Sequence, residues 1–94
     1  MAGKTVQLLL ALQDGPRHGY SIAQWVAKVD PTRPMGPGTL YGTIKRMLEE
    51  GLIEEISSSH EGRRKRYYRL TPVGEGVLSR EVQRLKNLLG QVKY

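Results

Sequence analysis

Residues 37–72, PGTLYGTIKRMLEEGLIEEISSSHEGRRKRYYRLTP, contain the pattern that decides the fold. In their first part, apolar side chains recur at helical spacing, which predicts an amphipathic helix from Pro37 to about Glu50. These side chains are Leu40, Ile44, Met47 and Leu48. Gly36 followed by Pro37 has the residue types of an N-cap and a first helical position, and Gly51 is the expected C-cap. The helix is therefore bounded at both ends by residues that favour helix termini.

The second part of this stretch predicts a β hairpin. Two short segments, 52–57 and 66–70, have strand-like composition, and Tyr68 and Leu70 alternate with their neighbours in the second. The polar segment 58–65 between them contains a glycine and is the expected tip of the hairpin. The stretch as a whole thus predicts a helix followed by a hairpin with a basic end.

The chain before residue 37 predicts two further helices. An apolar run over 6–12 suits a short helix buried at the centre of a small domain, and the turn-forming residues 14–16 end it. A second helix is expected from about 18 to 28, and the segment 30–38, with its three prolines and two glycines, resets the chain direction. With a last helix after the hairpin, the fold class is mainly α with a small β hairpin.

Composition limits the classes of protein that this chain can form. Its 94 residues suffice for one compact core. The absence of cysteine excludes disulfides, thiolate nucleophiles and cysteine-rich zinc sites. The longest strongly apolar run, 8–12, is too short to cross a bilayer, and residues 1–13 do not compose a signal peptide. We therefore expect a soluble cytoplasmic protein with no membrane partner, no cofactor and no metal.

Three helices followed by a two-stranded hairpin are the order of the winged helix-turn-helix, in which the third helix enters the DNA major groove and the hairpin lies against the backbone. The chain has a net charge of +6, and five cations against Glu61 within 60–69 supply four of these charges. The cations are Arg63, Arg64, Lys65, Arg66 and Arg69. Guanidinium groups match phosphate oxygens in bidentate geometry and the lysine ammonium pairs with them as a point charge, so the first four of these residues are expected to contact phosphates. The alternative is a solvated turn whose charges keep a strand edge from pairing with other chains.

The third helix is expected to read the bases. Its hydroxyls and cations can reach base edges or phosphates, and the contacts that we predict are Thr39, Tyr41, Gly42, Thr43, Lys45 and Arg46. Gly42 costs about 1 kcal/mol relative to alanine inside a helix. Two readings stay open for it: a missing side chain that lets the helix approach the groove closely, or a neutral choice.

The last helix is expected to form a dimer. Thr71 and Pro72 suit its N-cap and first position, and it should continue to about Val92. Its apolar residues follow the seven-residue repeat of a helix that packs lengthwise on another helix, and they are Leu78, Val82, Leu85, Leu89 and Val92. The alternative is a stripe that folds back onto its own domain. We accordingly divide the chain into a winged-helix DNA-binding domain, 1–71, and a C-terminal dimerisation helix, 72–94.

Several blocks of the sequence resemble the PadR-like transcriptional regulators, in the order in which that family has them. They are residues 8–12 (LLLAL), 15–16 (GP), 18–22 (HGYSI), 38–41 (GTLY), 48–53 (LEEGLI), 62–71 (GRRKRYYRLT) and Gly74. The resemblance implies a dimeric transcriptional regulator, usually a repressor, often released from DNA by a small aromatic or lipophilic effector. Gly42 stands where the family usually has proline. A chain with a single C-terminal helix is also expected to lack the extended effector domain of longer relatives.

Other functions find less support in the sequence. His18 and His60 lie in different segments, and no motif supplies a nucleophile with its base, a phosphate-cradling glycine loop or a set of metal ligands, so we expect no catalytic residue and no enzyme. His18 is expected to bond locally at a helix start, although it could also touch a phosphate. Trp25 can belong to the core or stack on a ligand. The rival function is a winged helix that binds another protein or a structured RNA.

Overall fold

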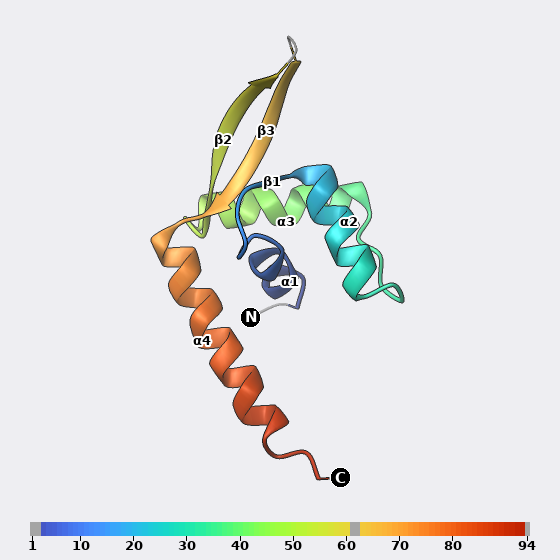
Figure 1. The fold of residues 1–94 in the computed structure, drawn as a ribbon, viewed down its shortest axis with the longest axis vertical. Coiled ribbons are helices and arrows are strands. Elements are labelled where there is room, and N and C mark those ends of the chain that lie inside the picture. Colours follow the sequence, from blue (N-terminus) through green and yellow to red (C-terminus); the bar gives the residue numbers. More distant parts are fainter. Residues whose placement is uncertain (1–2, 61–62, 94) are drawn as a thin grey trace.

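The computed structural model describes residues 3–60 and 63–93, with the side chains of 58–60 and 63–64 left out of the description. Figure 1 shows a body of helices from which a hairpin and one long helix project. In chain order the elements are α1 (Gly3–Ala11), β1 (Arg17–His18), α2 (Gly19–Val29), α3 (Pro37–Glu49), β2 (Ile53–His60), β3 (Arg63–Leu70) and α4 (Pro72–Leu89). Among the described residues, no helix is both long and apolar enough to cross a membrane.

The core is built around α1. Leu8 and Leu9 of this helix are completely buried, and α1 contacts α2, α3 and α4, which lie around it in Figure 1. The buried residues that complete the core come from every other helix and from the hairpin, and include Ile22, Val26, Leu40, Ile44, Met47, Leu52, Ile53, Tyr68 and Leu78. An apolar helix at the centre of a small domain is thus confirmed.

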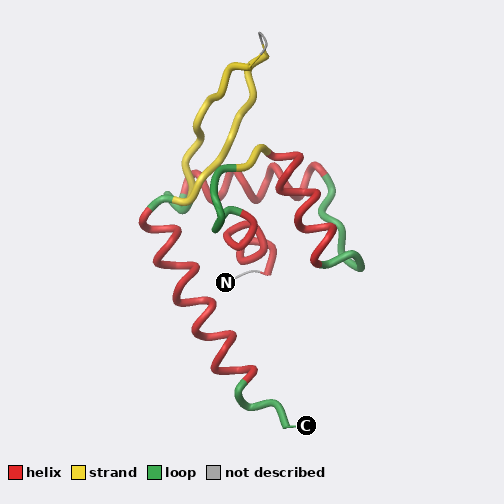
Figure 2. Tube along the Cα trace, viewed as in Figure 1, coloured by secondary structure: helices red, strands yellow, loops and turns green. Residues whose placement is uncertain are grey.

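The sheet has three antiparallel strands in the order β1-β3-β2. Strands β2 and β3 pair from Ile53 opposite Leu70 to His60 opposite Arg63, and we call this hairpin the wing. In Figure 2 the wing extends well beyond the helices. The prediction of a long polar tip over 58–65 was wrong, because both strands continue through most of that segment. The outer part of the hairpin, 57–60 and 63–66, has only polar residues in both strands, so it carries no hydrophobic alternation from which its length could be predicted.

Strand β1 was not predicted. It consists of two residues, and Arg17 and His18 pair with Tyr68 and Tyr67 of β3. Arg17 also donates from Nε to the Ala11 carbonyl at 2.8 Å and from Nη1 to Ser21 Oγ at 3.0 Å, so it joins the end of α1 to the start of α2. This short strand fastens the base of the wing to the helical body.

Local capping signals at the helix starts were confirmed. The start of α2 is capped by His18, whose Nδ1 accepts a hydrogen bond from the Ser21 backbone N–H at 3.1 Å. Thr71 caps α4 in the same way, accepting from the Gly74 N–H at 3.0 Å. The C-cap of α3 is Glu50 and not Gly51 as predicted, and Gly51 follows it with a φ of 73°, a left-handed conformation that glycine adopts without strain. These caps position the helix starts from which the candidate site is built.

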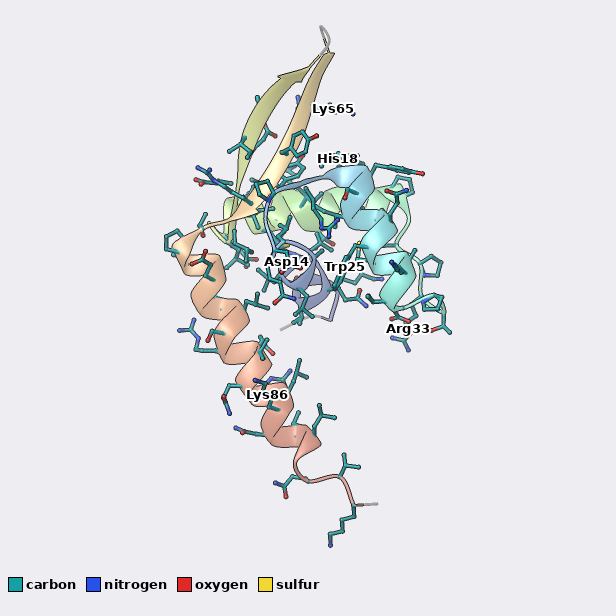
Figure 3. All side chains as sticks on the ribbon, viewed as in Figure 1. Asp14, His18, Trp25, Arg33, Lys65 and Lys86 are labelled. Carbon is teal, nitrogen blue, oxygen red and sulfur yellow. The ribbon has the colours of Figure 1, made fainter. Side chains whose placement is uncertain are left out.

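Helix α4 leaves the body after its first turns. Leu78 is buried and Val82 half-buried, whereas Leu85 is 37% and Leu89 65% exposed. In Figure 3 the side chain of Lys86 lies far from the wing, on the projecting part of this helix. The helix ends at Leu89, so Val92 lies beyond it and the predicted extension to that residue was wrong.

Candidate nucleic-acid interface

One face of α3 packs into the core and the other is exposed. Leu40, Ile44 and Met47 are buried. The exposed side carries a tyrosine, a glycine and two cations among other polar groups, and its members from the predicted set are Thr39, Tyr41, Gly42, Lys45 and Arg46. A chemically mixed helical face of this kind can both donate to base edges and pair with phosphates.

Thr43 does not belong to this face, and its prediction as a DNA contact is contradicted by its placement. The residue is only 3% exposed, and its hydroxyl donates to the Thr39 carbonyl at 2.7 Å. It stands three residues after Leu40 and four before Met47, within the same buried stripe. A threonine whose hydroxyl bonds to the preceding turn can be buried at little cost, and this is why its polarity misled the prediction.

Within the described residues, one ion pair lies at the base of the wing. Arg69 Nε donates to Glu54 Oε1 at 2.6 Å across the two strands. Arg69 is therefore compensated by a neighbouring carboxylate, whereas Lys65 and Arg66 are exposed further along β3. The predicted contacts Arg63 and Arg64 lie on β3 by their backbone, but their side chains fall outside the described part of the structure.

The start of α2, the exposed side of α3 and the wing meet around a cavity of about 540 Å³. Its lining residues are His18, Gly19, Tyr20, Tyr41, Lys65, Arg66 and Tyr68. Figure 3 shows Lys65 on the wing and His18 at its base. The cavity therefore connects the two predicted DNA-contacting elements through a third one, the start of α2, which contributes Tyr20 and His18.

The aromatic side chains of this region are held closely together. Tyr20 is 67% and Tyr41 52% exposed, while Tyr68 is 4% exposed. The His18 ring stacks on Tyr20 with centroids 6.5 Å apart and meets the edge of Tyr67 at 5.5 Å. Burial raises the pKa of the Tyr68 phenol and the nearby Glu55 carboxylate adds to this, against the opposing effect of Arg66. The Tyr68 hydroxyl therefore keeps its proton at neutral pH and can act as a donor.

Sequence reasoning did not identify Tyr20. Its hydroxyl-bearing ring stands next to a helix cap, and only the approach of β3 to α2 brings it to the cavity. Trp25, for which a ligand contact was the alternative to a core role, is half-buried and packs against the core. Helix α2 thus lines the cavity through its start and packs on the core through its middle.

Comparison with known proteins agrees with this architecture. The chain matches the family described as Transcriptional regulator PadR-like over residues 8–80. It is similar to the structure of a PadR family transcription regulator from Clostridium difficile R20291, with a TM-score of 0.81 and 28% identity over 93% of this chain and 94% of that one. The structure of Bacillus subtilis PadR in complex with operator DNA has a TM-score of 0.78 at 21% identity, over 87% of this chain and 48% of that chain, and it supports the fold.

Two curated relatives extend the comparison. Transcriptional regulator Rv3488 of Mycobacterium tuberculosis is 32% identical over 80 residues, which are 85% of this chain and 63% of that protein. An uncharacterized 37.1 kDa protein in transposon TN4556 of Streptomyces fradiae is 39% identical over 85 residues, 90% of this chain and 24% of that protein. The chain thus spans less than two thirds of either relative. The family is one of regulators and not of enzymes. Because the family match covers most of its length and the winged-helix architecture agrees, the chain belongs to the PadR-like family of transcriptional regulators.

Proposed function

We propose that this regulator is a cytoplasmic repressor that binds duplex DNA sequence-specifically as a homodimer and is released by a small aromatic or lipophilic effector. The observation that carries the proposal is the exposed face of α3, which joins the cationic wing around a shared cavity. A major groove about 12 Å wide accepts a helix, and the neighbouring backbone then meets the wing. In this arrangement Thr39, Lys45 and Arg46 read base edges, while Arg63, Arg64, Lys65 and Arg66 contact phosphates.

The proposed dimer rests on α4. Beyond Leu78, α4 and the residues after it expose a row of large apolar side chains, which favours burial of this surface against a partner. The row consists of Leu85, Leu88, Leu89 and Val92. A second copy that packs its own α4 along this row covers both rows at once, because a two-fold interface buries the same patch on each subunit. Residues 1–71 then form the DNA-binding domain and 72–94 the dimerisation helix. Two copies of α3 would read half-sites about one DNA turn, ~10 base pairs, or a multiple apart.

The experiment that tests this function measures affinity against salt for three nucleic acids: the DNA upstream of the coding sequence, a scrambled duplex of equal composition and an RNA hairpin. We expect the tightest binding to the upstream duplex, with a steep salt dependence. A triple variant with alanine in place of Arg63, Arg64 and Lys65 should bind the upstream and the scrambled duplex more weakly by a similar factor, because phosphate contacts are independent of sequence. Each lost contact should reduce the slope of log K against log salt by roughly 0.9. Preference for the RNA, or binding that salt leaves unchanged, would favour the RNA or protein module instead.

Gly42 provides a second test, because its two expected effects have opposite signs. A Cβ built at this position meets no other atom within 4 Å, so the fold itself does not require glycine there. Gly42→Ala should therefore stabilise the protein by up to about 1 kcal/mol through helix propensity. The same methyl group stands on the exposed side of α3, where it would hold the helix away from the groove. We expect a higher urea midpoint together with weaker operator binding. Unchanged affinity in the stabilised variant would leave Gly42 as a neutral choice.

A further inference from the structure

The cavity between α2, α3 and the wing has the chemistry of an anion site. Arg66 and Lys65 bring positive charge to its wall, and Tyr20, Tyr41 and Tyr68 bring hydroxyls. Among the described residues no carboxylate lines the cavity, although Glu55, the cross-strand partner of Tyr68, lies on the same face of the sheet and is close enough to act on the Tyr68 phenol, where Arg66 opposes its effect. Strand alternation places Arg66 on the same face of β3 as Tyr68. A wall of cations and donors favours an anionic ligand over a cation or an apolar molecule.

His18 adds a donor whose direction is fixed by its own cap. Because Nδ1 accepts the Ser21 N–H at 3.1 Å, the neutral ring carries its proton on Nε2. Its stacking on Tyr20 and its edge contact with Tyr67 hold the ring in place. His18, the last residue of β1, therefore presents an N–H donor at the base of the wing and keeps its capping bond to α2.

Gly19 brings the Tyr41 hydroxyl to the same place. A Cβ built on Gly19 would lie 2.8 Å from the Tyr41 hydroxyl oxygen, a distance too short for any side chain to occupy without moving the tyrosine. The absent side chain thus admits the end of Tyr41 to the start of α2. Through this contact α3, which is the proposed DNA-recognition helix, shares one polar cavity with the start of α2 and the wing.

We propose that this cavity holds one phosphate group of the DNA backbone, an assignment that rests on the proposed function. Arg66 pairs with the phosphate, and the Tyr41 hydroxyl and His18 Nε2–H donate to it. A duplex that receives α3 in its groove and the wing on its flank brings its backbone across this point, which lies between them. The start of α2 thereby becomes a third DNA-contacting element, with His18, Tyr20 and Tyr41 orienting the recognition helix.

The test compares full-length variants for binding to a mixed-sequence duplex by fluorescence anisotropy at constant ionic strength. His18→Asn keeps an N-cap acceptor and removes the Nε2 donor, and Arg66→Gln removes the charge. Each variant should bind about tenfold more weakly, the loss expected for a hydrogen bond to a charged group. Lys28→Gln removes the same charge from the exposed far end of α2 and is the matched control, expected to stay within about twofold because salt screens a distant charge. Thermal unfolding of His18→Asn should match that of the natural chain.

The double variant decides whether both residues face the same phosphate. Partners of one group are coupled, so the combined loss should fall well below the product of the single losses. A full product, or a His18→Asn variant with unchanged affinity, overturns the shared site. Inorganic phosphate at matched ionic strength should not displace the duplex, because the site depends on the backbone held by α3 and the wing; displacement would assign the cavity to a free anion instead. If the natural chain itself binds no duplex, the proposed DNA-binding function fails, and the assignment of the cavity to a backbone phosphate fails as a consequence.

Discussion

Replacement of Gly74 by alanine is expected to destabilise the protein by about 3 kcal/mol or more, because a well-packed site with no free space must be forced apart. A Cβ at this position would lie 1.9 Å from the Leu52 carbonyl oxygen, far inside van der Waals contact. That oxygen accepts hydrogen bonds from the Thr71 backbone N–H and hydroxyl, both at 3.1 Å. Relief of the clash therefore also pulls apart the junction at which α4 meets the start of β2.

The control for this substitution lies two residues further along the same helix. A Cβ on Gly76 meets nothing within 4 Å, so Gly76→Ala should leave the junction intact and stabilise the helix by up to about 1 kcal/mol. Urea unfolding followed by circular dichroism measures both variants. Equal free energies of unfolding for Gly74→Ala and Gly76→Ala would mean that α4 can move away from Leu52 at no cost in stability. The close contact between Gly74 and Leu52 would then not be needed for the fold.

Leu85→Asp is expected to convert the proposed dimer to a monomer and to weaken operator binding by roughly a hundredfold or more, since one subunit alone loses the second half-site. In the single chain Leu85 is already 37% exposed, so aspartate there is tolerated by the monomer fold. At a two-fold seam the same change places two carboxylates against apolar side chains, and burial of an unpaired charge is costly. Sedimentation together with operator titration gives both quantities.

Asn87→Asp is the matched control, because it adds the same charge close to Leu85 but outside the apolar row. Asn87 is exposed and its side-chain oxygen accepts a hydrogen bond from Gln83 Nε2 at 3.0 Å, a role that aspartate can keep. This variant should remain dimeric and bind DNA normally. A Leu85→Asp protein that stays dimeric and binds the operator with full affinity would rule out α4 as the dimer interface.

The helices, the start of α3 and the start of α4 could be predicted because the signals that set them are local, whereas the end of α4 was placed three residues too far. Gly36 and Pro37 begin α3, Gly51 follows its C-cap, and Thr71 caps α4 through an N–H three residues away. Each of these interactions is complete within one turn, so residue types and spacing suffice. The order of elements and the blocks that match the PadR-like family follow from the same local information.

Local spacing predicts less well which residues lie at the edge of the buried face of α3. Helical spacing predicts which side of α3 faces the core, but the width of that side depends on how closely the neighbouring elements approach. Thr43 falls inside because its hydroxyl bonds to Thr39, whereas Tyr41 stays outside at the start of α2. Periodicity therefore predicts Lys45 and Arg46 on the exposed face and Thr43 beside Leu40 and Met47, and it was the polarity of Thr43 that misled the prediction.

What the sequence by itself determined was each helix, the hairpin and the basic charge of the wing, since these depend on neighbours along the chain. Only the tertiary structure decided that two residues at 17–18 form a strand on β3, that Gly74 lies against Leu52, and that His18 shares a cavity with Tyr41 and Arg66. The physical reason is the range of the contacts. Pairing, close packing and a cavity wall join residues that are distant in the chain, and their partners exist only once the elements have packed together.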